Sequence, residues 1–394
     1  MFIVDAHLDL SYNALRGRDL TLPASQQKPD DEGTPTVGLP DLHAGGVGLV
    51  CATIFIEPAS RNAAGGYRSA DEAHEQSRRH LQWYNDQVGA GRMRWVRNRA
   101  ELTSIGQQSD RGAGAPRTPI NHGLEARATD GREPVGSAAA DAGTPGISPL
   151  ATNNQQLATT QHSALSTQHS ALPFILIMEG ADALRSGADV DWWWKQGLRI
   201  VGLAWKRTLL AGGTGEPGPL TPLGRTIAAA LDRAGFIHDT SHLAEEAFWQ
   251  LLEMTSGPVM ASHSNARAII PTDRQLSDDM ARAIAARGGI IGINLFGRFL
   301  VPPEQRGKRP AHLADAVRQV RHFADLFGHV RQIGLGTDLD GGFGREENPC
   351  ELTTIADLPK LADELSSAGF DDSDITGIMG GNWIGYFGRV LPTE

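Results

Sequence analysis

The chain contains little cysteine, no long apolar run and no surplus of basic residues. Only Cys51 and Cys350 occur in 394 residues, far apart and outside any CxxC pair, which excludes a disulfide framework and a cysteine-built zinc site. The formal net charge is -10 and no Lys/Arg-rich segment is present, so nucleic acid is not an expected partner. No apolar run reaches the roughly 18 residues that a membrane span requires, and the N-terminus lacks the pattern of a signal peptide. These absences predict a cytoplasmic protein that does not contact a membrane.

The composition is that of a soluble globular protein, with 40% hydrophobic and 21% charged residues. The length allows one large α/β barrel or two smaller domains. The segment 106–172 differs from the rest, because Gly, Ala, Ser, Thr, Gln and Pro dominate it and the pentapeptide Gln-His-Ser-Ala-Leu occurs in it twice. We predict that this segment is a disordered, low-complexity insertion, so its histidines are poor candidates for metal ligands.

Eight short apolar runs alternate with stretches of helical periodicity. The runs begin near residues 3, 49, 174, 199, 235, 258, 289 and 333. Helical patterns cover 69–88, 243–255, 277–287, 310–327, 358–367 and 374–390. Buried strands that alternate with helices form a parallel sheet, and eight of them predict a (β/α)8 TIM barrel. Residues 1–394 would then be a single catalytic domain, with the insertion between the second and third strands.

Histidines and carboxylates are concentrated at the predicted carboxyl ends of these strands, where the active site of such a barrel lies. The first strand ends in His7-Leu8-Asp9, and alternation along a strand places both polar side chains on one face. Later strands end in, or lead directly to, Glu179, His242, His263 and Asp338. Imidazole and carboxylate groups that converge on one point suit a divalent transition metal such as zinc. The sequence therefore predicts a metal centre at this end of the barrel.

The number of polar groups indicates two metal ions. Three histidines and two or three carboxylates exceed the needs of one tetrahedral zinc ion, and they fit two ions that share a carboxylate and a water or hydroxide. Glu179 is the expected bridge, and Zn2+ is the expected ion. Two cations would lower the pKa of the shared water and make it a nucleophile at neutral pH. Asp338 is placed to take its proton and to pass it to a leaving amine.

Three residues beside these candidates have simpler interpretations. Asp340 stands two residues after Asp338 and could lie on the same face, but we interpret it as a residue that shapes the turn. Asp239 is interpreted as support for a ligand, and His238 as a packed residue.

Other conspicuous residues are assigned to structure. The polar residues of the predicted helix 69–88, His74 and His80 among them, are expected on a solvated face. The Trp192–Trp194 triplet is expected in the core. The Gly-rich segment 212–218 is followed by no Walker lysine, so it predicts a flexible loop beside the active site and no phosphate site.

In combination, these motifs make the chain similar to a known family. The matching segments are Asp5-Ala6-His7-Leu8-Asp9, Glu179-Gly180, Asp239-Thr240-Ser241-His242, Ser262-His263-Ser264 and Gly336-Thr337-Asp338-Leu339-Asp340-Gly341, with Gly45-Gly46-Val47-Gly48 and Gly380-Gly381-Asn382-Trp383 as further matches. They resemble motifs of the membrane (renal) dipeptidase family of the amidohydrolase superfamily. His242 and His263 are 21 residues apart, the spacing of that family's two histidine ligands.

The resemblance implies a dizinc hydrolase that cleaves the peptide bond of dipeptides by attack of a metal-bridging hydroxide. It implies that His7 and Asp9 hold one metal ion, that His242 and His263 hold the other, and that Glu179 bridges them. Asp338 would be the proton shuttle, and Arg274 would bind the C-terminal carboxylate of the substrate through its planar guanidinium. Relatives also suggest a homodimer.

One position departs from the family. Trp205 stands where the family's dipeptidases carry a histidine that contacts the substrate, and Lys206 and Arg207 follow it. An indole has one N–H donor and cannot become cationic, so it replaces that histidine poorly. Either Lys206 or another donor takes over this role, or the substrate differs from an ordinary dipeptide. Two alternatives therefore stand beside a dipeptidase: an amidohydrolase of another small amide, lactam or lactone, and a metal-binding homologue without catalysis.

Overall fold

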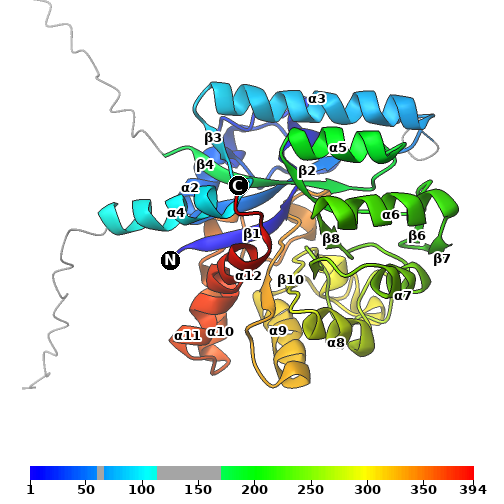
Figure 1. Cartoon of the computed structure of the whole chain (residues 1–394). Helices are drawn as coiled ribbons and strands as arrows, with labels where there is room; N and C mark the ends of the chain where they lie inside the picture. Colours follow the sequence, from blue (N-terminus) through cyan, green and yellow to red (C-terminus); the bar gives the residue numbers. More distant parts are fainter. Residues whose placement is uncertain (60–65, 113–169) are drawn as a thin grey trace, which may run out of the picture. The chain divides into compact units, whose positions relative to one another are not determined.

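A computed structural model describes residues 1–59, 66–112 and 170–394. Its main sheet contains parallel strands in the order β10–β11–β1–β2–β4–β5–β8–β9, and a parallel bridge between Ala261 and Ile291 joins the two ends of that order. The bounds are β1 Ile3–Leu8, β2 Val47–Phe55, β4 Leu172–Glu179, β5 Leu198–Gly202, β8 Ile237–Asp239, β9 Val259–Met260, β10 Ile291–Ile293 and β11 Ile333–Leu335. The sheet is a nearly closed parallel barrel, and the predicted (β/α)8 fold is confirmed (Figure 1).

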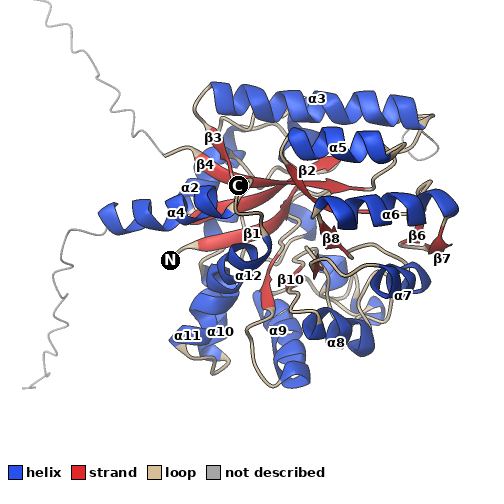
Figure 2. Cartoon of the chain, in the orientation of Figure 1, coloured by secondary structure: helices blue, strands red, loops and turns tan. Residues whose placement is uncertain are grey.

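Helices surround the barrel strands and bury them (Figure 2). The helices are α1 Leu10–Leu15, α2 Leu39–Ala44, α3 Ala70–Gly89, α4 Arg99–Gly112, α5 Gly187–Lys195, α6 Pro222–Ala234, α7 Glu245–Met254, α8 Asp278–Ala286, α9 Leu313–Phe327, α10 Lys360–Ser367, α11 Asp372–Thr376 and α12 Asn382–Val390. All eight residues of β4 are buried, as are nearly all of β2, with which it pairs. Because neither face of such a strand meets water, its sequence is a continuous apolar run, which is the pattern that predicted these strands.

Local chemistry sets the ends of the helices. At the start of α6 the hydroxyl of Thr221 accepts a hydrogen bond from the backbone N–H of Gly224, and Pro222 fits the first turn. The helix ends at Gly235, whose φ of 85° lies in the left-handed region. The helices predicted from periodicity are present with ends displaced by a few residues. The last predicted helix is divided, because a π-helical turn at Gly377–Gly381 separates α11 from α12.

Helix α12 covers the amino-terminal end of the barrel. Its side chains Trp383, Tyr386 and Phe387 form one apolar cluster with residues from the early parts of the strands, such as Val4 and Leu49. The indole N–H of Trp383 donates to the carbonyl of Leu335 at 2.9 Å, and the hydroxyl of Tyr386 donates to the carbonyl of Val259 at 2.8 Å. The opposite end of the barrel, where the strands finish, is left for the polar residues.

The segment 212–218 differs from its prediction. It does not form an irregular loop, but belongs to an antiparallel hairpin of β6 (Ala211–Gly213) and β7 (Glu216–Leu220). Glycine allows this hairpin to pack against the loop after β5, because a Cβ atom at Gly213 would meet the carbonyl oxygen of Lys206. The hairpin therefore packs closely against the loop that follows β5.

His80 also differs from its prediction. It does not lie on a solvated face of α3, because it is only 6% exposed and its Nδ1 atom is 2.8 Å from the hydroxyl of Ser11. His74 contacts the carbonyl of Ala183. In the Trp192–Trp194 triplet the middle residue is fully buried and both neighbours pack against the core, as predicted.

The predicted insertion lies mostly outside the described residues, so the division into one domain with an insertion at 106–172 stays a prediction. Helix α4 includes its first residues, and β4 begins at Leu172. A short strand, β3 (Met93–Trp95), pairs with the start of β4, and its three residues are too few to give a sequence pattern. Among the described helices, none combines the length and the apolar character that a bilayer crossing requires.

The burial of His80 predicts a loss of stability in acid. Burial lowers the pKa of His80 from 6.5 to about 4, so the unfolded chain binds an extra proton between these pH values. The stability that neutral His80 contributes is present above about pH 6.5 and is lost as the pH falls toward 4. Between pH 7 and pH 5 we expect the free energy of unfolding in urea to fall by about 2 kcal/mol more in the wild type than in His80→Gln. Equal losses in the two proteins would contradict this assignment.

Candidate metal centre

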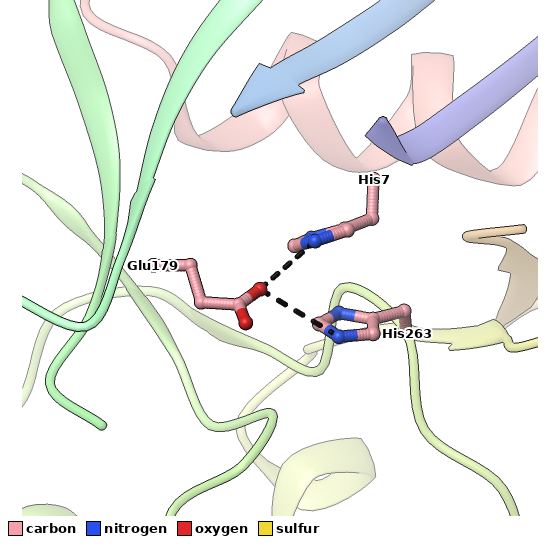
Figure 3. Close-up of side chains that lie close together, drawn as sticks. All are labelled: His7, Glu179 and His263. Atoms are coloured by element: carbon pink, nitrogen blue, oxygen red, sulfur yellow. Dashed lines mark ion pairs between the residues drawn. The ribbon is translucent and has the colours of Figure 1, made fainter. Parts of the chain in front are cut away.

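Glu179, the last residue of β4, faces the imidazoles of His7 and His263, which stack on each other with their ring centres 3.7 Å apart (Figure 3). Its Oε2 atom is 2.8 Å from His7 Nε2 and 3.7 Å from His263 Nε2. Its Oε1 atom is 3.5 Å from His242 Nε2, and the Nε2 atoms of His242 and His263 are 3.0 Å apart. One carboxylate therefore contacts three imidazoles, which come from the ends of β1, β8 and β9.

Two further carboxylates lie close to His7. Asp9 Oδ2 and Asp338 Oδ1 are each 4.0 Å from His7 Nε2. Asp9 lies one residue beyond β1, at the N-cap position of α1, and its side chain makes no capping hydrogen bond. The turn into the helix, and not alternation along the strand, therefore directs its carboxylate. The structure brings together all six residues that the sequence predicted for the metal centre: His7, Asp9, Glu179, His242, His263 and Asp338.

The backbone around this cluster adopts a conformation that L-residues rarely occupy. The φ angles of His242 and Asp338 are 65° and 62°, in the left-handed region. A residue held there costs of order 1–3 kcal/mol, and such residues are concentrated at functional sites. Glycine is needed at position 341, because a Cβ atom there would meet the carboxylate of Asp338.

Hydroxyl groups hold the outer nitrogens of two imidazoles. Ser262 Oγ is 2.7 Å from His263 Nδ1, and it donates a hydrogen bond of 2.6 Å to Asp239 Oδ2. Asp239 therefore supports His263 through Ser262, in agreement with its interpretation from the sequence. Thr214, at the tip of the β6–β7 hairpin, places its Oγ1 atom 3.0 Å from His242 Nδ1. Each contact directs the opposite nitrogen, Nε2, toward the centre of the cluster.

The protonation of the imidazoles favours a metal. Burial lowers the pKa of His242 and His263 well below its usual range, and the positive charges of Arg274 and His7 lower it further. Both imidazoles are therefore neutral at pH 7, the form that binds a metal ion. Burial acts in the same direction on His7, but the negative charges of nearby carboxylates, Glu179 first, raise its pKa to about 10. The carboxylates thus attract positive charge at this point.

The residues fit divalent cations. Asp9 Oδ1 is buried and has no hydrogen-bond partner among the described residues. A buried carboxylate oxygen without a partner is unfavourable, and a coordinated cation would satisfy it. Imidazole nitrogen and carboxylate oxygen together are a ligand set for zinc and for other divalent transition metals.

Asp338 differs from the other carboxylates in its proton affinity. Its Oδ2 atom accepts a hydrogen bond of 2.9 Å from the side-chain amide of Asn294. Burial raises its pKa to about 7, with the charge of His7 opposing and that of Glu179 assisting. A carboxyl group that titrates near neutral pH suits general acid–base catalysis.

The neighbours Asp340 and His238 lie away from the cluster, as interpreted. Asp340 is buried, accepts hydrogen bonds from the backbone of Thr36 and is 3.2 Å from the guanidinium of Arg18, so it fixes a loop. His238 is buried with its Nε2 atom 3.2 Å from Asp232 on α6.

Arg274 lies next to His263, and only 3% of it is exposed. Its guanidinium donates to the hydroxyl of Ser264 at 3.0 Å and to the carbonyl of His263 at 2.6 Å. No carboxylate of the described residues lies within ion-pair distance of it, and its Nε atom has no partner among them. Arg274 is thus a buried cation whose charge is balanced only at longer range.

A cavity of about 620 Å³ opens over the cluster, within the range of small-molecule sites. Asp9, Glu179, His242 and Asp338 line it, and Trp205 lines it as well. Lys206 places its ammonium 5.2 Å from the centre of the Trp205 ring. Arg274 does not line the cavity itself. Its guanidinium lies 5.3 Å from the ring centre of Phe299, and Phe299 does line the cavity.

For three residues the sequence predicted no supporting role: Ser262, Asn294 and Thr214. Asn294 follows the end of β10, so the rule that marked the ligands, a polar residue at a strand end, applies to it as well. Ser262 directly precedes His263. Thr214 has no such signal, because its contact with His242 exists only once the hairpin has folded over the rim.

The family model of membrane dipeptidase (peptidase family M19) matches residues 147–392, which is more than half of the chain. The chain belongs to the membrane dipeptidase family. It is accordingly a hydrolase of the metallopeptidase class that acts on peptide bonds, as the resemblance of its motifs implied.

Curated relatives agree with this assignment. A Klebsiella pneumoniae protein, an uncharacterized protein in the pqqA 5′ region, is 30% identical over 230 residues, which cover 56% of this chain and 81% of that protein. Dipeptidase aclJ of Aspergillus oryzae is 32% identical over 44% of this chain and 39% of its own length. Dipeptidase 3 of Mus musculus is 30% identical over 43% of this chain and 33% of its own length. The match thus spans less than half the length of these two dipeptidases.

Solved structures support the fold. The crystal structure of a metallopeptidase called dipeptidase AC matches this chain with a TM-score of 0.72 at 21% sequence identity. The match covers 99% of each of the two chains. A Rhodobacter sphaeroides metallopeptidase, bound to a phosphinate mimic of L-Ala-D-Ala, gives the same TM-score, identity and coverage.

A matched pair of substitutions tests the contact between Thr214 and His242. Thr214→Val keeps the shape of the side chain but removes the hydroxyl that orients the imidazole, whereas Thr214→Ser keeps the hydroxyl. We expect Thr214→Val to weaken the binding of at least one divalent ion by about 10-fold or more, and Thr214→Ser to bind as the wild type does. Titration of metal-free protein with Zn2+ against a chelating dye measures the effect. The control is Thr226→Val, on the exposed side of α6. Wild-type affinity in Thr214→Val would exclude an orienting role.

Proposed function

We propose that the protein hydrolyses the peptide bond of dipeptides with two divalent metal ions, most simply Zn2+. The observation that carries the proposal is the contact of one carboxylate, Glu179, with three imidazoles. We assign His7 and Asp9 to one ion, His242 and His263 to the other, and Glu179 to both. When bound, the ions would supply a hydroxide at neutral pH and polarise the carbonyl of the scissile bond.

The proposed task of Asp338 is to move a proton. A proton released by the attacking water is taken by its carboxylate and is then given to the leaving amine. The amide of Asn294 holds Oδ2, so Oδ1 stays turned toward the ligand cluster. A pKa near 7 lets the same group accept the proton in one step and release it in the next.

The proposed task of Arg274 is to bind the C-terminal carboxylate of the substrate. A buried cation without a paired anion is unfavourable, and a ligand carboxylate would compensate it through two parallel hydrogen bonds. The Nε atom, which lacks a partner among the described residues, is available for one of them. This task requires that the guanidinium be reached from the cavity that Phe299 lines.

Relatives support a dipeptide as the substrate. The relative from Aspergillus oryzae is named a dipeptidase, and the Rhodobacter sphaeroides structure holds a dipeptide mimic. Trp205 favours a second candidate, the hydrolysis of another small amide, lactam or lactone, because an indole cannot replace a cationic imidazole. The cytoplasmic location expected from the sequence, and the homodimer implied by the resemblance, are likewise proposals.

The direct test is turnover of a dipeptide library by metal-free protein to which Zn2+ or Mn2+ has been added. Cleavage of dipeptides that stops when a chelator is added is the expected outcome. Turnover of lactams or lactones alone would favour the second candidate. Binding of two metal ions without any turnover would indicate a homologue that has lost catalysis and would overturn the proposal.

Asp338→Asn tests the proton shuttle. The substitution keeps the size of the side chain but removes the group that exchanges the proton, so kcat should fall by about 100-fold or more, while both metal ions stay bound. Elemental analysis of the purified variant measures the metals, and steady-state kinetics measure kcat. Full activity in this variant would show that another group moves the proton.

Arg274→Ala tests the carboxylate clamp. We expect KM to rise mainly for dipeptides with a free C-terminal carboxylate, because only these lose a charge-assisted contact. Dipeptide amides provide the matched control, since they lack that charge. An equal rise for both kinds of substrate would exclude the clamp, and melting temperatures check that the buried substitution leaves the protein folded.

A further inference from the structure

Six aromatic side chains line the cavity, and ring contacts divide them into two groups. The first triad is Tyr12, Phe55 and Trp205, in which the ring centres of Phe55 lie 5.3 Å from Tyr12 and 5.0 Å from Trp205. The second triad is Phe296, Phe299 and Phe343, in which the ring centres of Phe296 lie 4.9 Å from Phe299 and 4.2 Å from Phe343. Trp205 thus completes an aromatic wall at the position where the family has a histidine.

The order of the strands places the two triads on either side of the imidazoles. His242 and His263 follow β8 and β9. In the barrel β8 is next to β5, which precedes Trp205, and β9 is next to β10, which precedes Phe296 and Phe299. A peptide bond held at the ligand cluster therefore has one triad on each flank.

Each triad can be matched to one end of a dipeptide, and this step rests on the proposed function. The guanidinium of Arg274 lies 5.3 Å from the ring centre of Phe299, so a carboxylate bound by Arg274 places the C-terminal residue at the second triad. The first triad is close to the bridging carboxylate, because a Cβ atom at Gly180 would lie 3.6 Å from the Cβ atom of Trp205. The first triad is therefore matched to the side chain of the amino-terminal residue.

We propose that the protein prefers dipeptides with bulky apolar side chains at both positions, and that Trp205 determines specificity at the amino-terminal one. Aromatic rings in contact with one another offer an apolar surface to an aliphatic or aromatic side chain. Beside the first triad, Arg16 pairs with Asp31 at 2.7 Å and the hydroxyl of Tyr12 donates to Glu32 at 2.7 Å. The ammonium of Lys206 lies 5.2 Å from the centre of the Trp205 ring. The indole therefore needs no catalytic role to explain its presence.

Four dipeptides test the proposal: Ala-Ala, Leu-Ala, Ala-Leu and Leu-Leu, each with an L- and with a D-residue at the C-terminus. Apolar pockets discriminate by about 10-fold or more for each methylene, so Leu should raise kcat/KM over Ala by at least about 10-fold at either position. Trp205→Ala should abolish the Leu/Ala ratio at the amino-terminal position and keep the ratio at the other. Phe343→Ala should abolish the Leu/Ala ratio at the C-terminal position and keep the ratio at the amino-terminal one.

Controls separate this proposal from its foundation. Trp249→Ala removes an exposed tryptophan of α7 and should leave both ratios unchanged. Phe343→Leu replaces Phe343→Ala if the latter does not fold, and it should lower the C-terminal ratio in part. The specificity proposal would be overturned if Ala-Ala were cleaved as fast as Leu-Leu, or if one variant lost the Leu/Ala ratios at both positions. The proposed dipeptidase function would stand in either case. If the metal-loaded protein cleaved none of the four dipeptides, the proposed function itself would be overturned.

Discussion

The shared contact of Glu179 with three imidazoles is the constraint on which the rest of the site depends. It requires that the ends of β1, β4, β8 and β9 meet at one height, which the nearly closed barrel of parallel strands provides. The register of β4 fixes this height, because Glu179 pairs with Phe55 on one side and Gly202 on the other. A slip of one residue would turn the carboxylate to the helices.

The cluster destabilises the folded state locally, and the residues around it compensate for this cost. Two residues have left-handed backbones, and several carboxylates are buried close together. Asp239, Ser262 and Thr214 hold the imidazoles in place, and the first two are also hydrogen-bonded to each other. Preorganisation of this kind lets a site bind cations without first rearranging.

Most of the barrel and its six polar residues could be predicted from the sequence, because each buried strand is an apolar run and each ligand follows such a run. Prediction failed where the contact depends on packing between distant segments. The burial of His80 depends on the position of α1 over α3, and the role of Thr214 depends on a hairpin whose glycines suggest only flexibility. Alternation along a strand does not account for the place of Asp9, because this residue lies beyond the end of β1, in the turn that leads into α1.

The placement of α12 has a consequence for biosynthesis. β1 pairs with β11, and the aromatic side chains of α12 seal the space between the strands at the amino-terminal end. β1 therefore obtains both neighbours and its cover only after β11 and α12 have been synthesised. Since contacts between such distant segments form slowly, an emerging chain exposes apolar strands until α12 has been made, and this fold should depend on protection by chaperones more than a protein whose contacts are local.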